Sequence, residues 1–234
     1  MKKCLLLINK KSGRGERAAE DKRLPLALRK YYAEVVTKYL NDGDDTGADI
    51  GELAVGFDAL AVCGGDGTLN SAINATRNLN IELIYIPYGT LNDSAKCLQL
   101  TKHFRREDRE IRRIDLGEID GRLFTYVAAA GTFTPIGYTA KTKLKKRLKI
   151  FAYMLEVLKE YKVRRIKADI TANGNSYSGE YSLIMAVNSK RCFGFNFNRL
   201  YKHNSGTAHL LLINAPRRGG LIGTISMFFP FFRA

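Results

Sequence analysis

The 234-residue sequence predicts an α/β protein in two parts, in which a parallel sheet with helices is followed by an antiparallel β-sandwich with one amphipathic helix. Three observations support this prediction. Strand-like and helix-like segments alternate in the first half, turn dipeptides separate short strands in the second half, and most of the net charge of +15 lies in the second half. Alternating strands and helices are typical of a parallel sheet, and closely spaced strands with tight turns are typical of a sandwich.

The first half contains four segments with the length and composition of strands, which are Lys3–Asn9, 33–37, 58–63 and 81–86. The first is nearly all apolar, as expected for a strand that is covered on both faces. A basic, glycine-bearing loop at 10–15 follows it, and Pro25 is well placed for the first turn of a helix. Further helices are expected to begin near Thr68 and to contain 95–98.

The second half favours antiparallel pairing. Segments 113–119 and 122–130 flank Asp120-Gly121, and segment 165–172 leads into Asn173-Gly174. Both dipeptides are strong signals for two-residue hairpin turns. Two more strands are expected at 180–188 and His209–Asn214. One helix interrupts them, with an apolar stripe at helical spacing made by Leu144, Leu148, Phe151, Leu155 and Leu158.

We place the domain boundary near Arg112, which gives domains 1–112 and 113–234. The first domain holds 18 basic and 16 acidic side chains, and the second holds 20 and 7. No carboxylate side chain follows Glu180. This asymmetry indicates that the second domain favours an anionic surface.

Composition excludes several classes of protein. The chain is too hydrophobic for a disordered protein, and no apolar run approaches the roughly 18 residues of a membrane span. Its first residues do not form a signal peptide, and its four cysteines lie far apart without the spacing of a zinc site or a disulfide framework. We therefore expect a cytoplasmic protein. Its high pI is compatible with nucleic-acid binding, but no nucleic-acid module is recognised, so we expect no nucleic-acid partner.

The most informative motif follows the third candidate strand and reads Gly64-Gly65-Asp66-Gly67-Thr68-Leu69-Asn70. Glycines let the backbone turn sharply and approach a ligand, and the amides of such a turn form a site for phosphate together with the helix N-terminus. Asp66 beside a phosphate is favourable only if it meets a cation or a substrate hydroxyl. The alternative interpretation is a tight turn in which Asp66 caps the helix.

A second loop follows the fourth candidate strand and reads Pro87-Tyr88-Gly89-Thr90-Leu91-Asn92-Asp93. In a parallel sheet, both loops lie at the carboxyl ends of their strands, where ligands bind. Gly89 and Thr90 offer donors, and Asn92 and Asp93 offer polar contacts. The alternative is a capping sequence for the helix that follows.

Together these segments resemble the diacylglycerol kinase catalytic family, which includes soluble bacterial lipid kinases and the sphingosine and ceramide kinases. The resemblance implies a nucleotide-binding first domain, a lipid-binding sandwich and a cleft between them. It implies ATP and Mg²⁺ as cofactors and Asp66 as the catalytic residue. The residues that it implies for nucleotide binding are Asn9, Ser12, Thr37, Gly64, Gly65, Asp66, Gly67, Thr68, Leu69, Asn70, Gly89, Thr90, Asn92 and Asp93.

The sequence departs from the family pattern at several places. Lys10 stands where the family usually has proline, and Ser71 where a glutamate often follows the first motif. The family's Asp-Gly-x-x-Asp, which helps to hold magnesium, aligns best with Ser205-Gly206-Thr207-Ala208-His209. A late carboxylate base would fall in a segment after Ala234. We therefore assign no metal ligand, and we expect a chain that lacks the family's C-terminal segment and transfers phosphate poorly.

We interpret the sequence as an ATP-dependent lipid kinase that phosphorylates a hydroxyl of a diacylglycerol-like lipid. Residues 141–167 carry eleven Lys or Arg and two Glu, a composition that favours peripheral contact with an anionic inner membrane face. Two alternatives remain open. One is a catalytically impaired pseudokinase that binds nucleotide or lipid, and the other is an enzyme like the NAD kinases, which share the first motif. The sequence makes no prediction of oligomeric state.

Overall fold

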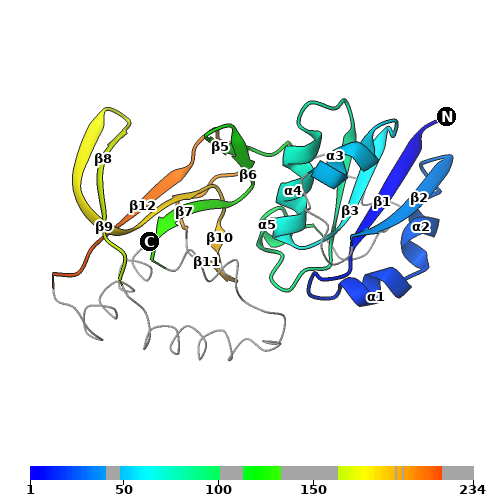
Figure 1. Cartoon of the computed structure of the whole chain (residues 1–234), viewed down its shortest axis with the longest axis horizontal. Helices are drawn as coiled ribbons and strands as arrows, with labels where there is room; N and C mark the ends of the chain where they lie inside the picture. Colours follow the sequence, from blue (N-terminus) through cyan, green and yellow to red (C-terminus); the bar gives the residue numbers. More distant parts are fainter. Residues whose placement is uncertain (41–47, 101–112, 133–162, 193, 197, 218–234) are drawn as a thin grey trace. The chain divides into compact units, whose positions relative to one another are not determined.

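The computed structural model describes residues 1–40, 48–100, 113–132, 163–192, 194–196 and 198–217. Contacts divide the chain into two units (Figure 1). The first comprises Met1–Tyr126, Arg191–Phe195 and His203–Gly206, and the second comprises Val127–Lys190, Asn196–Lys202 and Thr207–Ala234. The expected amphipathic helix lies outside the described residues.

The first unit is built on a parallel sheet of four strands in the order β2-β1-β3-β4. The strands are β1 (Lys3–Asn9), β2 (Glu34–Leu40), β3 (Ala59–Gly64) and β4 (Glu82–Pro87). The helices are α1 (Gly15–Glu20), α2 (Arg23–Leu28), α3 (Ala48–Ala54), α4 (Asp66–Thr76) and α5 (Asp93–Cys97). The predicted parallel α/β architecture is therefore confirmed.

Both faces of this sheet are covered, as the apolar composition of β1 predicts. Successive side chains of a strand point to opposite faces, so β1 serves two cores. One core joins alternate residues of β1 and β3 to α1 and α2, and its fully buried members include Cys4, Leu6, Ala18, Leu28 and Ala61. The other core joins the intervening residues to α3 and α4, and its members include Leu5, Leu7, Ile50, Leu60 and Ala72.

The second unit contains an antiparallel sheet, in agreement with the predicted class. Its strands are β7 (Val127–Gly131), β8 (Ile166–Ala172), β9 (Asn175–Val187) and β12 (His209–Asn214). The order is β12-β9-β7, and β8 pairs with the first half of β9. Asn173 and Gly174 join β8 to β9 with φ of 49° and 77°, as a two-residue hairpin turn requires.

A small hairpin, β5 (Gly117–Ile119) with β6 (Arg122–Phe124), lies within the first unit, although the sequence boundary near Arg112 assigned it to the second domain. The reason is its attachment to α4. Asn74 Nδ2 donates to the carbonyl of Leu123 (2.8 Å), and Asn74 Oδ1 accepts the backbone amide of Leu123 (2.9 Å). The remaining short strands are β10 (Arg191–Cys192) and β11 (Phe195–Asn196).

Helices of the described part are all too short or too polar to cross a membrane. The proposed membrane contact of the basic segment 141–167 depends mainly on residues outside that part, and it stays an expectation from sequence.

Replacing Asn74 with alanine is expected to lower the free energy of unfolding by about 1–3 kcal/mol, because it leaves the Leu123 amide and carbonyl without their side-chain partner. Thermal unfolding measures this loss. Asn78→Ala is the matched control, since Asn78 is exposed in the turn after α4. Equal melting temperatures for the two variants would show that the hairpin does not depend on Asn74.

Candidate active site

The strand order places a topological switch point between β1 and β3. The chain passes from β1 to β2 on one side of the sheet and then returns to β3 on the other side of β1. In open parallel sheets, ligands commonly bind at such a point, outside the carboxyl ends of the strands. The loop after β1 holds Ser12 and Gly13, and the loop after β3 holds Gly65.

Three loops meet at this edge through their backbones. A Cβ on Gly13 would lie 2.6 Å from the Thr90 nitrogen, and a Cβ on Gly89 would overlap the Cα of Gly65. Any side chain at these positions would therefore separate the loops. The amides of Tyr88 and Gly89 both donate to the carbonyl of Gly64, at 2.8 and 3.0 Å.

Asn9 and Ser12 stabilise the first loop. Asn9 Nδ2 donates to Thr68 Oγ1 in α4 (2.9 Å), and Asn9 Oδ1 accepts the backbone amide of Lys11 (3.0 Å). Ser12 Oγ donates to the Asn9 carbonyl (2.9 Å). The structure thus brings together Asn9, Ser12 and Thr68, three of the residues that the resemblance implies for nucleotide binding.

Gly67 differs from the other glycines of the first motif. It is exposed in the first turn of α4, and a Cβ built on it would meet no atom within 4 Å. The adjoining Gly65 has less room, since its Cβ would lie 3.3 Å from the Gly89 Cα. Gly67 is therefore the position at which the motif faces open space.

Asp66 accepts hydrogen bonds from another helix, not from its own. Its Oδ2 accepts the Asp93 amide (3.0 Å) and its Oδ1 accepts the Ser94 amide (2.8 Å), so both oxygens bind the first two amides of α5. The N-cap of α4 is Gly65, which has no side chain to offer. Asp66 therefore caps a helix, as in the alternative interpretation, but the helix is α5 and not α4.

Asp93 is buried, with a relative exposure of 1%. Its Oδ2 accepts the Gly194 amide (2.8 Å), and its Oδ1 lies 3.5 Å from Arg191 Nε. Burial raises the pKa of this carboxyl above its ordinary value, and the Gly194 hydrogen bond opposes the rise. Sequence reasoning missed Arg191 and Gly194, because no local motif marks them.

Asn92 forms the turn before α5. It adopts a left-handed conformation (φ 50°), and its side-chain amide donates to the Gly89 carbonyl at 3.0 Å. The Tyr85 hydroxyl donates to Asn92 Oδ1 at 3.4 Å. Asn92 is buried, with a relative exposure of 4%, and its hydrogen bond to Gly89 stabilises the second loop.

Three of the residues predicted to bind nucleotide lie in a strand or a helix and not in the glycine-bearing loops. Thr37 lies in the middle of β2 opposite Leu6, because β2 continues to Leu40. Leu69 is buried in α4 at 4% exposure, and Asn70 Oδ1 accepts the Thr125 amide at 3.1 Å. Thr37 thus belongs to the sheet and Leu69 to the buried part of α4. Asn70 links α4 to the residue that follows the small hairpin.

Tyr88 connects the second loop to the end of α1. Its hydroxyl donates to Asp21 Oδ2 (3.2 Å), and its carbonyl accepts the Arg14 amide (2.8 Å). Arg23 donates to both oxygens of Asp21 at 2.8 Å. These hydrogen bonds, led by those from Arg23, lower the pKa of Asp21 to about 2.

Solved structures show where this fold occurs. A diacylglycerol kinase from Bacillus anthracis strain Sterne superposes with a TM-score of 0.69 at 21% identity, over 99% of this chain and 78% of that chain. A second solved chain from that organism gives a TM-score of 0.74 at 22% identity, with the same coverage. At these identities the likeness establishes the fold.

The family follows from sequence comparison. The model of the diacylglycerol kinase catalytic domain matches residues 3–120, so the chain belongs to the diacylglycerol kinase catalytic domain family. A diacylglycerol kinase of Bacillus subtilis (strain 168) is 29% identical over 216 residues, which are 83% of this chain and 68% of that protein. One of Staphylococcus saprophyticus is 31% identical over 163 residues, and the chain spans 53% of its length.

Replacing Asp21 with asparagine is expected to lower the melting temperature at pH 7. The carboxyl has a pKa of about 2 when folded and about 3.9 when unfolded, so its stabilising effect is present above pH 4 and is lost as the pH falls toward 2. Melting curves of both proteins across this window measure the effect. A difference that stays constant down to pH 2 would contradict it.

Proposed function

We propose that the chain transfers the γ-phosphoryl group of ATP to a hydroxyl of a diacylglycerol-like lipid. Family membership and the names of the curated relatives support a lipid kinase. The observation that carries the proposal is the meeting of three glycine-bearing loops at the carboxyl ends of β1, β3 and β4, beside the exposed Gly67 in the first turn of α4. No comparable observation favours a NAD kinase-like enzyme or a pseudokinase.

ATP would bind with its phosphates over the turn from Gly65 to Gly67. Phosphoryl transfer depends mainly on positioning and on neutralising charge, and rigid backbone donors meet the first need without rearrangement. The close approach of Gly65 and Gly89 fixes the two loops as one surface. Gly13 and Thr90 extend this surface toward the loop after β1.

Asp66 is the residue that we assign to the reacting centre. Two amides of α5 hold its carboxylate in one orientation, and a carboxylate has about four lone-pair positions, so acceptor capacity remains. Asp93, in contrast, is engaged by Arg191 and Gly194. Asp66 would therefore approach the lipid hydroxyl or a cation, and Asp93 would hold the loop in place.

Mg²⁺ fits this arrangement as a companion of ATP. Among the described residues, no three His, Cys, Asp or Glu side chains gather to form a cage for an ion. Mg²⁺ commonly binds through one or two carboxylates together with substrate phosphates, and Asp66 supplies one such carboxylate. When bound, the ion would neutralise charge on the transferred phosphoryl group.

Replacing Gly67 with alanine is expected to weaken ATP binding about tenfold, because the methyl group enters the space where the phosphates approach. Alanine is also more favourable than glycine within a helix, so the melting temperature of the Gly67→Ala variant should not fall. Titration calorimetry measures the affinity. Gly179→Ala, which has ordinary contact distances from 3.6 Å, is the matched control. Unchanged affinity in the Gly67 variant would place the phosphates elsewhere.

Incubation with radiolabelled ATP, Mg²⁺ and short-chain diacylglycerol should label the lipid, with γ-phosphate transferred to its free hydroxyl. Asp66→Asn should reduce the rate of labelling by about 10²–10⁴-fold, the usual effect of losing a positioned acid or base. Asp120→Asn removes the same charge from a hairpin turn and should have no effect. Labelling of NAD without labelling of lipid would overturn the proposal.

A further inference from the structure

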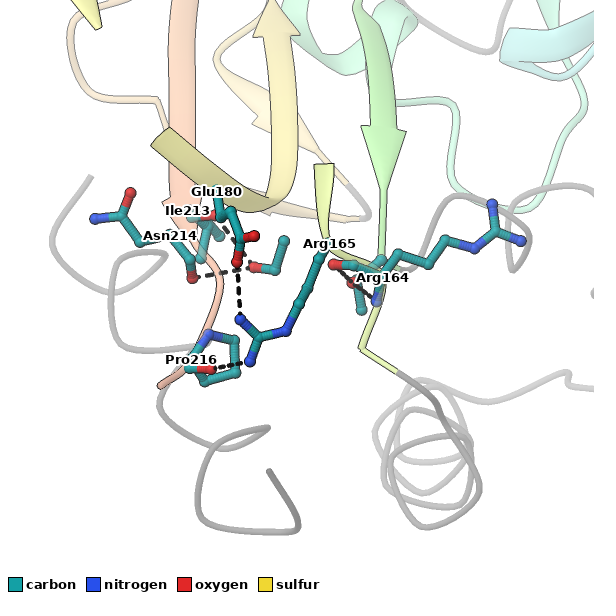
Figure 2. A network of polar contacts seen from close by, with 8 residues as sticks. Arg164, Arg165, Glu180, Ile213, Asn214 and Pro216 are labelled. Atoms are coloured by element: carbon teal, nitrogen blue, oxygen red, sulfur yellow. Dashed lines mark hydrogen bonds and ion pairs between the residues drawn. The ribbon is translucent and has the colours of Figure 1, made fainter. Parts of the chain in front are cut away.

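Arg14 and Arg191 are the two half-buried arginines among the residues that the structure describes. Arg191 is engaged, since its Nε lies 3.5 Å from Asp93 Oδ1. Even the exposed Arg165 is engaged, because it donates to Glu180 Oε2 at 3.0 Å (Figure 2). The guanidinium of Arg14, in contrast, forms no hydrogen bond or ion pair with any described residue. It therefore keeps five N–H donors for a ligand.

Two contacts with Tyr88 hold Arg14 beside the glycine-bearing loops. The backbone amide of Arg14 donates to the Tyr88 carbonyl (2.8 Å), and its guanidinium carbon lies 5.8 Å from the centre of the Tyr88 ring. The preceding residue, Gly13, lies so close to Thr90 that a Cβ would not fit between them. A cation over an aromatic ring is attracted through its charge and not through its N–H groups. The ring thus holds Arg14 without using its donors.

Asp21 holds the ring on which Arg14 lies. Asp21 Oδ2 accepts the Tyr88 hydroxyl (3.2 Å), and Arg23 donates to both oxygens of the same carboxylate at 2.8 Å. Burial and the nearby Asp21 carboxylate raise the pKa of Tyr88, so its hydroxyl stays protonated and can donate. Because Asp21 is already paired with Arg23, its attraction for the Arg14 guanidinium is reduced.

We propose that Tyr88 and Asp21 are positioning residues, which orient Arg14 to bind the terminal phosphates of ATP. The inference rests on the proposed use of ATP. Arginine presents its donors in a rigid fork that matches two oxygens of a phosphate. The neighbouring turn of the first motif brings a carboxylate, Asp66, toward the same phosphates, so a cation is needed to balance the charge. Arg14 would contact the nucleotide, and Tyr88 and Asp21 would act through it.

The group recognised is a phosphate oxyanion, which the headgroup of an anionic lipid also carries. The burial of Arg14 favours the nucleotide. Arg14 is half-buried against Tyr88, whereas Lys11 and Arg17, which lie three residues to either side of it in sequence, are exposed. A membrane surface would meet the exposed cations first. A phosphate chain that enters between the loops would meet Arg14.

Nucleotide affinity tests the role of Arg14. In titrations of the whole chain, Arg14→Gln should weaken ATP binding by about tenfold or more, the usual effect of losing a hydrogen bond to a charged group. AMP, measured by displacement of ATP, should bind as before because it lacks the terminal phosphates. Arg17→Gln removes the same charge from an exposed position in α1 and is the matched control. Equal losses for ATP and AMP, or an equal loss in the control, would overturn the proposal.

A double-mutant cycle tests the positioning. Tyr88→Leu should weaken ATP binding nearly as much as Arg14→Gln, and combining the two changes should cost no more than the larger single loss, because both remove one interaction. Tyr31→Leu controls for lost packing, since Tyr31 and Tyr88 contact the same core. Additive losses would overturn the role of Tyr88. Tyr88→Phe keeps the ring but loses the bond to Asp21, so full ATP affinity in that variant would overturn the role of Asp21.

Two further measurements separate this inference from the alternatives. Arg14→Gln should reduce co-sedimentation with phosphatidylglycerol vesicles no more than Arg17→Gln does. A larger loss of vesicle binding with unchanged ATP affinity would assign Arg14 to a lipid headgroup and overturn the proposal. A chain that binds ATP through Arg14 but labels no lipid would overturn the proposed function and support this inference. A wild-type chain that binds no ATP would overturn both.

Discussion

The close approach of Gly65 to Gly89 is the contact on which the proposed active site depends. It brings the ends of β3 and β4 together without intervening side chains, so the carbonyl of Gly64 can accept the amides of Tyr88 and Gly89. With the two loops held, α4 and α5 begin close enough for Asp66 to bind the first amides of α5. A bulkier residue would separate the loops and leave that carboxylate without its partners.

The local features of the fold were largely predictable from sequence. β1 and β12 have the expected bounds, because each is a short apolar segment with clear ends. β2 was predicted too short. Its last residues, Lys38, Tyr39 and Leu40, look irregular in sequence, but β1 pairs with all of them as far as Ile8 and Asn9. Pairing with a buried neighbour extends a strand beyond what its own composition indicates.

Long-range features of the candidate site were not predictable. The glycine motifs indicated the loops and their meeting at one edge of the sheet. They did not indicate that Asp66 would accept hydrogen bonds from the first amides of α5. Nor did they indicate that Asp93 would be buried against Arg191 and Gly194. These contacts join residues far apart in the chain, and their residue types are common on protein surfaces. Burial, which gives them their importance, is a property of the folded chain alone.

The pairing of Asp93 with Gly194 has a consequence for how the protein is made. The two residues are 101 positions apart, yet both belong to the first unit, which is therefore discontinuous in sequence. During synthesis, the parallel sheet and its helices leave the ribosome long before Arg191 and Gly194 do. Until then, the Asp93 carboxylate has neither its hydrogen-bond donor nor its ionic partner. The first unit can complete its native contacts only after most of the second has been translated, so the two cannot fold as wholly separate domains.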